Sequence, residues 1–160
     1  MTLKPKVMAI ASFGGHWVQL MRLRPAWDDC EVVYVATSKD CKGEVIGYAE
    51  ENGLETPEFH AIPDANKSTK WKLIAQSLCL VWILLRTRPE VIVSTGAAAG
   101  LLALFLGRLM GARTIWVDSI ANADKLSLSG SHAGRVADLW LTQWPHLASP
   151  KGPSHEGAVL

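Results

Sequence analysis

The chain has 160 residues, of which 49% are hydrophobic and 19% charged, so it can form one domain with a hydrophobic core and is not a disordered polymer. Its formal net charge of +1 argues against a general electrostatic attraction to nucleic acid. The three cysteines form no CxxC pair and fit neither a zinc site nor a disulfide scaffold, so a reducing compartment is expected.

Apolar runs and helical patterns alternate along the chain. The first apolar run is too short for a spanning helix and lacks a small-residue cleavage site, so it is predicted as a strand and not a signal peptide. We predict strands over Lys6–Ser12, Glu31–Thr37, Glu58–Ile62, Val91–Thr95, Arg113–Asp118 and Leu139–Gln143. Helices are predicted over Trp17–Pro25, Lys42–Asn52, Thr69–Thr87, Ala97–Met110 and near His132–Ala137. Residues 149–160, rich in Pro, Gly and Ser, are predicted to be a tail over the surface.

The alternation predicts an α/β fold, a Rossmann-like doubly wound parallel sheet in one domain spanning residues 1–160. Continuous apolar strands such as EVVYVATS and EVIVSTG suit a parallel sheet that is covered on both faces. In the common strand order 3-2-1-4-5-6, the first and fourth strands are neighbours. Ligands of such sheets bind in the crevice outside the carboxyl ends of these strands.

Two glycine-rich loops would meet at that crevice. The candidate ligand-binding residues are Ser12, Gly14 and Gly15 in the first loop, and Ser94, Thr95 and Gly96 in the second. Each loop leads into a helix whose first N–H groups and dipole favour an anion, so together they suit a diphosphate. The alternative is that the glycines only make tight turns. The GxGxxG fingerprint is absent and no acidic residue ends the second strand, which argues against a nicotinamide cofactor.

His16 and Asp118 are the candidate catalytic residues. His16 opens the first helix, and because imidazole titrates near neutral pH, it can accept the proton of an attacking sugar hydroxyl. The alternatives for His16 are a helix cap and a hydrogen bond to phosphate. Asp118, at the end of the fifth strand, is expected to be the base, to orient His16, or to cap a turn. Ser119 and Asn122 are candidates for hydrogen bonds to sugar hydroxyls, with local capping as the alternative.

The segment KSTKWKLIAQSLCLVWILLRTR is apolar in its centre and basic at both ends. Its apolar stretch from Leu73 to Leu85 is too short to span a bilayer. With Lys67, Lys70, Trp71 and Lys72 at its start, the segment predicts an interfacial helix on an anionic membrane surface. The alternative is a crossover helix buried against the sheet.

Four motifs carry a family resemblance that extends from about Val7 to Leu147: SFGGH, VSTGAAAG, TIWVDSIANADKLSLSG and ADLWLTQWPHL. Together they resemble the acceptor-binding subunit of the split, two-chain glycosyltransferases. The eukaryotic member builds the second GlcNAc of the dolichol-linked oligosaccharide, and bacterial relatives act in exopolysaccharide and capsule assembly, some as glucuronosyltransferases. The Gly-Gly-His turn is also similar to that of MurG, the one-chain peptidoglycan glycosyltransferase, whose N-terminal half binds a lipid-diphosphate acceptor.

The resemblance implies a GT-B enzyme divided in two, with this chain as the N-terminal half. It would be inactive alone and would bind a lipid-diphosphate-linked sugar acceptor, while a donor-binding partner subunit holds the nucleotide sugar for inverting transfer of GlcNAc or GlcA. Trp144 and Pro145, at the end of the sixth strand, are predicted to contact that partner at the interdomain cleft. The eukaryotic subunit begins with a transmembrane helix and this chain does not. The expected relative is therefore bacterial, with peripheral attachment at the cytoplasmic face of the plasma membrane.

Neither a metal nor another cofactor is predicted, because no Asp-x-Asp motif occurs and the remaining histidines lack ligand spacing. Many relatives carry Glu where this chain has Asp118, and the carboxylate of the shorter aspartate reaches less far from the backbone. One alternative function is a non-catalytic membrane anchor that recruits a catalytic partner. Another is a stand-alone nucleotide-binding oxidoreductase domain, which the missing fingerprint disfavours.

Overall fold

The computed structural model describes residues 4–65 and 70–159. Its sheet has six parallel strands in the order β3-β2-β1-β4-β5-β6. The strands are β1 (Lys6–Ala11), β2 (Glu31–Ala36), β3 (Glu58–Ala61), β4 (Val91–Ser94), β5 (Arg113–Val117) and β6 (Leu139–Leu141). The predicted α/β fold class is confirmed, and the strand order is the common one, in which β1 and β4 are neighbours.

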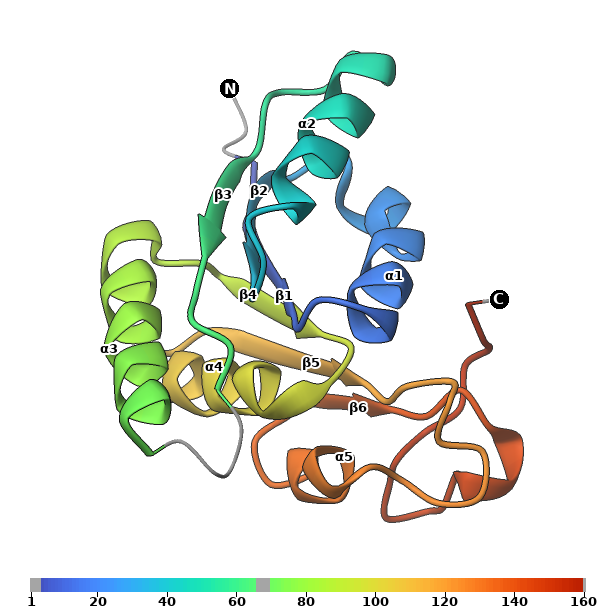
Figure 1. Cartoon of the computed structure of the whole chain (residues 1–160). Helices are drawn as coiled ribbons and strands as arrows, with labels where there is room; N and C mark the ends of the chain where they lie inside the picture. The colour runs from blue at the N-terminus through green and yellow to red at the C-terminus, as the bar shows by residue number, and fades with distance from the viewer. Residues whose placement is uncertain (1–3, 66–69, 160) are drawn as a thin grey trace.

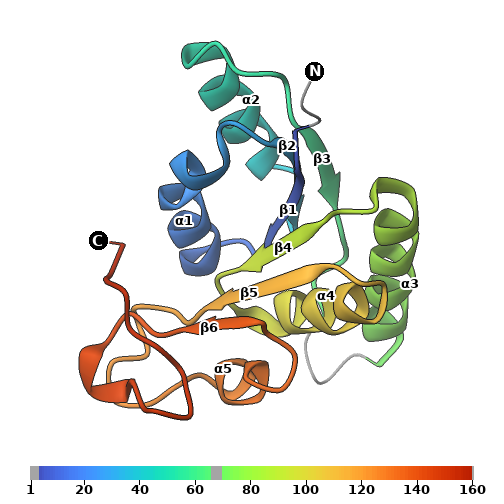
Figure 2. The ribbon, with the colours of Figure 1, turned by 180° about the vertical axis from the view of Figure 1, so that it is seen from behind.

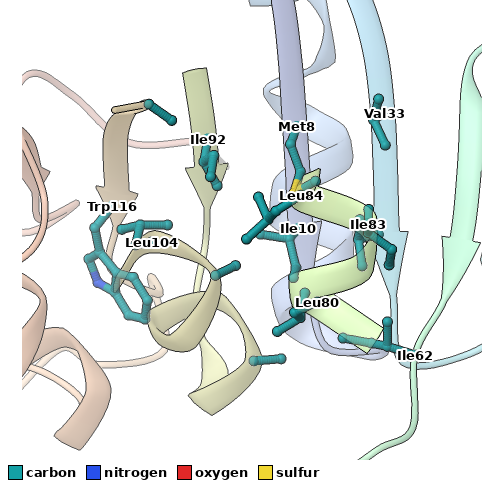
Figure 3. Close-up of a cluster of buried hydrophobic side chains, with 14 of the residues drawn as sticks. Met8, Ile10, Val33, Ile62, Leu80, Ile83, Leu84, Ile92, Leu104 and Trp116 are labelled. Atoms are coloured by element: carbon teal, nitrogen blue, oxygen red, sulfur yellow. The ribbon is translucent and has the colours of Figure 1, made fainter. Parts of the chain in front are cut away.

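Helices cover both faces of the sheet (Figures 1 and 2). They are α1 (Gly15–Arg22), α2 (Cys41–Glu51), α3 (Lys70–Thr87), α4 (Ala97–Leu109) and α5 (Leu128–Ala133), with short 3-10 helices at Arg24–Trp27 and Pro145–Leu147. Strand alternation explains the two layers, because successive side chains point to opposite faces. Met8 and Ile10 of β1 join the cluster beneath α3 and α4, which Figure 3 shows, whereas Val7 and Ala9 join the cluster beneath α1 and α2.

The structure corrects two predicted helices. The first begins at Gly15, earlier than predicted, and ends at Arg22, before a separate 3-10 helix, Arg24–Trp27, that contains Pro25. The last was predicted near His132–Ala137, but α5 begins at Leu128. Its N-cap is Ser127, whose hydroxyl oxygen accepts a hydrogen bond from the Gly130 N–H over 2.8 Å. A serine N-cap of this kind fixes where a helix begins.

The predicted C-terminal tail is held against the edge of the sheet. Ser154 forms a parallel bridge with Leu141 of β6, and the segment then runs beside α1 (Figures 1 and 2). There the Arg22 guanidinium donates to the Val159 carbonyl oxygen over 3.3 Å.

Thr69, the predicted start of the third helix, and Lys67 lie outside the described residues. Across residues 4–65 and 70–159, none of the helices combines the length with the apolar character that crossing a bilayer requires.

Candidate functional site

The candidate site lies at the carboxyl ends of β1 and β4. The two strands pair in parallel, with Ile10 opposite Ser94, so the loops that follow them leave the sheet side by side. The first loop leads into α1 and the second into α4. The sequence prediction that two glycine-rich loops meet at this edge is therefore confirmed.

A reciprocal pair of hydrogen bonds joins the loops. The His16 ring bonds through Nδ1 to the Thr95 carbonyl oxygen over 3.0 Å, and Thr95 Oγ1 donates to the His16 carbonyl oxygen over 2.6 Å. Because a carbonyl oxygen can only accept, Nδ1 must carry the proton in this contact. In the neutral ring, the lone pair then lies on Nε2, which is the nitrogen able to act as a base.

Gly96 makes room for the histidine ring. It has a φ of 146°, and a β-carbon at this position would overlap the His16 ring. The next residue, Ala97, has a φ of 68°, a left-handed conformation that is uncommon for a residue with a side chain. The close approach of the two loops therefore depends on a glycine and is accompanied by local backbone strain.

Gly96→Ala is expected to lower the free energy of unfolding by about 1–2 kcal/mol or more, because it combines an unfavourable φ with a clash. The measurement is chemical denaturation of the purified chain. The matched control is Gly43→Ala in α2, where a β-carbon meets nothing within 4 Å and a helical alanine is favoured. Equal stability of Gly96→Ala and the parent would contradict the packing of His16 described above.

The Asp118 carboxylate is used within its own chain, as the turn-capping alternative expects. Its side chain is 1% exposed, and its oxygens accept from Trp116 Nε1, Asn122 Nδ2, and the backbone N–H and hydroxyl of Ser127, over 2.7–3.2 Å. A carboxylate can accept about four hydrogen bonds, so these four donors satisfy the Asp118 carboxylate. His16 bonds to Thr95 instead, and the described residues include no hydrogen bond between His16 and Asp118. The prediction that Asp118 orients His16 is corrected: Asp118 organises the loop from β5 to α5.

The predicted ligand-binding residues divide into exposed and buried groups. Ser12, Gly14, Gly15 and Asn122 are at least partly accessible, whereas Ser94, Thr95, Gly96 and Ser119 are buried. The Ser94 hydroxyl contacts the Gly96 backbone, and Ser119 Oγ accepts from Gln19 Nε2 over 3.0 Å. The Ser94 and Ser119 side chains therefore form hydrogen bonds within the protein, and for Ser119 this agrees with the local role given as its alternative.

Both helices that open at the site lack a side-chain cap. The N-caps of α1 and α4 are Gly14 and Gly96, neither supplies a side-chain oxygen, and neither helix has an acidic residue in its first turn. By contrast, Ser127 caps α5 in the same structure. Uncapped N-terminal N–H groups with an unopposed helix dipole are able to receive an anion.

Comparison with known proteins identifies the family. Residues 7–158 match the family model described as "Oligosaccharide biosynthesis protein Alg14 like". The chain belongs to the Alg14 family. The UDP-N-acetylglucosamine transferase subunit ALG14 of Yarrowia lipolytica is 30% identical, over 94% of this chain and 80% of the relative. The subunit of the same name from Mus musculus is 24% identical, over 89% of this chain and 76% of the relative.

Among solved structures, MurG of Acinetobacter baumannii is similar with a TM-score of 0.70 at 13% identity, over 94% of this chain and 44% of the MurG chain. UDP-N-acetylglucosamine 2-epimerase of Rickettsia bellii follows the same fold, with a TM-score of 0.64 at 14% identity, over 89% of this chain and 40% of the epimerase. These likenesses concern the fold, and this chain spans less than half of either protein. The curated relatives named above come from a yeast and a mouse, and the bacterial exopolysaccharide setting stays a prediction.

Trp144, which was predicted to contact a partner subunit, is also bonded within its own chain. In this Alg14-family chain it is half-buried, and its Nε1 donates to the Ile120 carbonyl oxygen over 2.7 Å. His146 bonds to the Ala123 carbonyl oxygen over 2.6 Å. Trp144 therefore braces the loop after β5, while the neighbouring Pro145 is exposed.

Two exposed apolar residues at the same edge were missed as site candidates. Phe13, between Ser12 and Gly14, is 61% exposed although its backbone N–H is fixed by Thr37 Oγ1 over 2.9 Å. Leu128, the first residue of α5, is also exposed. In the sequence, Phe13 could have been noticed as an apolar residue within a loop of small and polar residues at the carboxyl edge of the sheet.

Proposed function

We propose that the chain is the acceptor-binding subunit of a two-component inverting glycosyltransferase in lipid-linked oligosaccharide or polysaccharide synthesis. Membership of the Alg14 family and the transferase-subunit names of its relatives support a heteromeric transferase. Those names favour UDP-GlcNAc as the donor, held by the partner subunit. The observation that carries the acceptor role is the pair of uncapped helix N-termini beside His16. That arrangement fits a sugar diphosphate better than a neutral ligand.

The proposed reaction uses groups on both chains. The acceptor hydroxyl attacks the anomeric carbon of the donor sugar, a new glycosidic C–O bond forms, and the bond to the nucleoside diphosphate oxygen breaks. His16 Nε2 takes the hydroxyl proton, since its Nδ1 proton is engaged by Thr95. The amides at the starts of α1 and α4 hold the acceptor diphosphate, and the departing nucleotide stays with the partner.

The purified chain alone is expected to transfer no sugar, because catalysis requires both substrates to be held in one geometry and this chain supplies the acceptor side. The measurement is transfer of labelled GlcNAc from UDP-GlcNAc to a lipid-diphosphate sugar, with this chain alone and with its co-purified donor-binding partner. Turnover by the isolated chain at the rate of the pair would overturn the split-enzyme proposal. In the alternative, a non-catalytic anchor, the pair would be active and insensitive to replacement of His16.

A membrane contact on α3 is the second part of the proposal. The helix is apolar on two opposite sides: Leu80, Ile83 and Leu84 face the core, whereas a separate stripe faces solvent. The exposed stripe consists of Trp71 (81% exposed), Ile74, Leu78, Val81, Trp82 and Leu85. Its spacing of three and four residues puts these side chains along one line of the helix surface. The core side of α3 packs against the sheet, as the alternative interpretation of a crossover helix expects, and the apolar stripe on its solvent side supports the membrane contact.

The charges on α3 favour an anionic lipid surface. Its sequence contains Lys70, Lys72 and Arg86 but no acidic residue. Lys72 and Arg86 are exposed, and the Arg86 guanidinium lies 5.6 Å from the centre of the Trp82 ring. An apolar stripe bordered by tryptophan and basic residues is typical of a helix that lies in the membrane interface.

Leu78→Glu combined with Trp82→Glu is expected to weaken binding to phosphatidylglycerol-containing vesicles by about ten-fold or more, since each buried apolar side chain contributes about 1.5–3 kcal/mol. Vesicle co-sedimentation measures the effect. Leu139→Glu is the matched control, because Leu139 is an exposed apolar residue on β6. Absent binding by the parent, or equal losses in the test and control variants, would contradict the membrane contact.

A further inference from the structure

Gln19 and Gln143, the glutamine pair, are buried together behind the candidate site. Gln19 lies on α1, one helical turn after His16, and Gln143 lies just beyond β6. Both side chains are more than nine-tenths buried. Gln143 Nε2 donates to Gln19 Oε1 over 2.8 Å, so α1 and the end of the sheet are joined by an amide-to-amide hydrogen bond.

The remaining amide atoms of Gln19 bind the loop after β5. Its Nε2 donates to Ser119 Oγ over 3.0 Å, and its Oε1 accepts from the Ile120 backbone N–H over 3.1 Å. Gln19 therefore connects the helix that carries His16 with the loop that carries Asn122.

The remaining amide atoms of Gln143 bind two backbones. Its Nε2 also donates to the Asp118 carbonyl oxygen over 2.9 Å, and its Oε1 accepts from the Val159 N–H over 2.9 Å. The C-terminal segment beside α1 is thereby tied into the same cluster (Figure 2).

Backbone groups fix the orientation of both amides. An N–H can only donate, so the N–H of Ile120 requires the oxygen of Gln19, and the N–H of Val159 requires the oxygen of Gln143. With both oxygens assigned, the Gln143 nitrogen faces the Gln19 oxygen, as a hydrogen bond requires. A flipped amide on either residue would set donor against donor or acceptor against acceptor.

We propose that the glutamine pair positions the 118–122 loop relative to the helix that carries His16, and that it does so for the transfer reaction. This inference rests on the proposed function. Burying two amide groups has a desolvation cost that an apolar pair would avoid. The hydrogen bonds of the two amides allow only one relative arrangement of the segments that they join. The three segments that meet at the pair are α1, the loop after β5 and the C-terminal segment, and the first two border the site. Gln19 and Gln143 are thus positioning residues, which act through His16 and Asn122.

The orientation argument predicts the outcome of an isosteric substitution in the pair. In Gln143→Glu, an oxygen replaces the nitrogen and faces two other oxygens, those of Gln19 and the Asp118 backbone. An unsatisfied buried polar group costs about 1–3 kcal/mol, so Gln143→Glu should raise the acceptor KM or lower kcat by about ten-fold, with the KM for UDP-GlcNAc unchanged.

The experiment measures these constants in the assembled pair, and the ¹⁵N signals of the His16 ring in the chain alone. Gln143→Met, which keeps the side-chain length, is a second variant should the carboxylate prevent folding. Gln76→Leu is the matched control: Gln76 is buried on α3, and its amide bonds to the Pro63 carbonyl oxygen over 2.8 Å. We expect Gln76→Leu to lower the melting temperature without moving the His16 signals or the acceptor constants.

The proposal holds if Gln143→Glu or Gln143→Met shifts the His16 signals and the acceptor constants while Gln76→Leu does not. It is overturned if folded Gln143 variants keep both readouts of the parent, or if Gln76→Leu changes them equally. If the parent pair transfers no sugar, the proposed function fails, and the His16 signals alone then decide the positioning role.

Discussion

His16→Ala in the assembled pair is expected to lower kcat by about 100-fold or more while changing the acceptor KM little, because general-base catalysis contributes at least that factor. The reason is the tautomer of the ring. The Thr95 carbonyl oxygen accepts a hydrogen bond from Nδ1–H, so Nε2 is the unprotonated nitrogen in the neutral state. The position of the ring is set before substrate binds, since Gly96 leaves the space that it occupies.

His16→Asn separates catalysis from structure. The asparagine amide nitrogen takes a place close to that of Nδ1 and can keep the hydrogen bond to the Thr95 carbonyl oxygen, but it supplies no base. This variant should match the parent in melting temperature and His16→Ala in rate. If His16 instead holds phosphate, both substitutions should raise the acceptor KM and leave the rate at saturation largely intact. If it serves only the turn, His16→Asn should be as active as the parent.

The fold was predictable because its signals are local. Apolar runs and the turns between them predicted six parallel strands, and the common order of such sheets, which brings two glycine loops together at β1 and β4, is the order observed. The start of α5 was placed too late because the sequence alone does not show that Ser127 acts as the N-cap. Ser127 is selected by its bonds to Asp118, nine residues earlier in the chain. Which serine acts as the cap depends on how the loop folds back against the end of β5, and the periodicity of apolar residues gives no information on that.

The chemistry of the site was less predictable for the same reason. A carboxylate at the end of a strand has the same sequence signature whether it faces a ligand or, like Asp118, four donors of its own chain. Trp144 was expected to contact a partner subunit, and the sequence did not show that its indole N–H bonds to Ile120 on another loop. The apolar character of α3 was visible in the sequence, whereas the assignment of its residues to a core side and a solvent side required the packing.

Gly15→Val is expected to abolish use of the acceptor by the assembled pair without lowering the stability of the chain. A β-carbon at Gly15 meets nothing within 4 Å, and Gly15 does not have a positive φ, so the fold tolerates a side chain there. Its neighbour Gly14 has a φ of 104° and is required by the backbone itself. The space over Gly15 is where an anion must come to reach the first amides of α1, and a valine side chain would occupy it.

The measurement compares the acceptor KM, the binding of UDP-GlcNAc to the pair, and the melting temperature of the chain. The proposed diphosphate site requires loss of acceptor use with donor binding and melting temperature unchanged. Gly14→Ala is the contrasting control, because it places a side chain on a left-handed backbone and should lower the free energy of unfolding by about 1–2 kcal/mol. Normal acceptor kinetics in Gly15→Val would mean that the diphosphate does not approach the start of α1. The uncapped amides of α4 would then be the remaining anion site at this edge of the sheet.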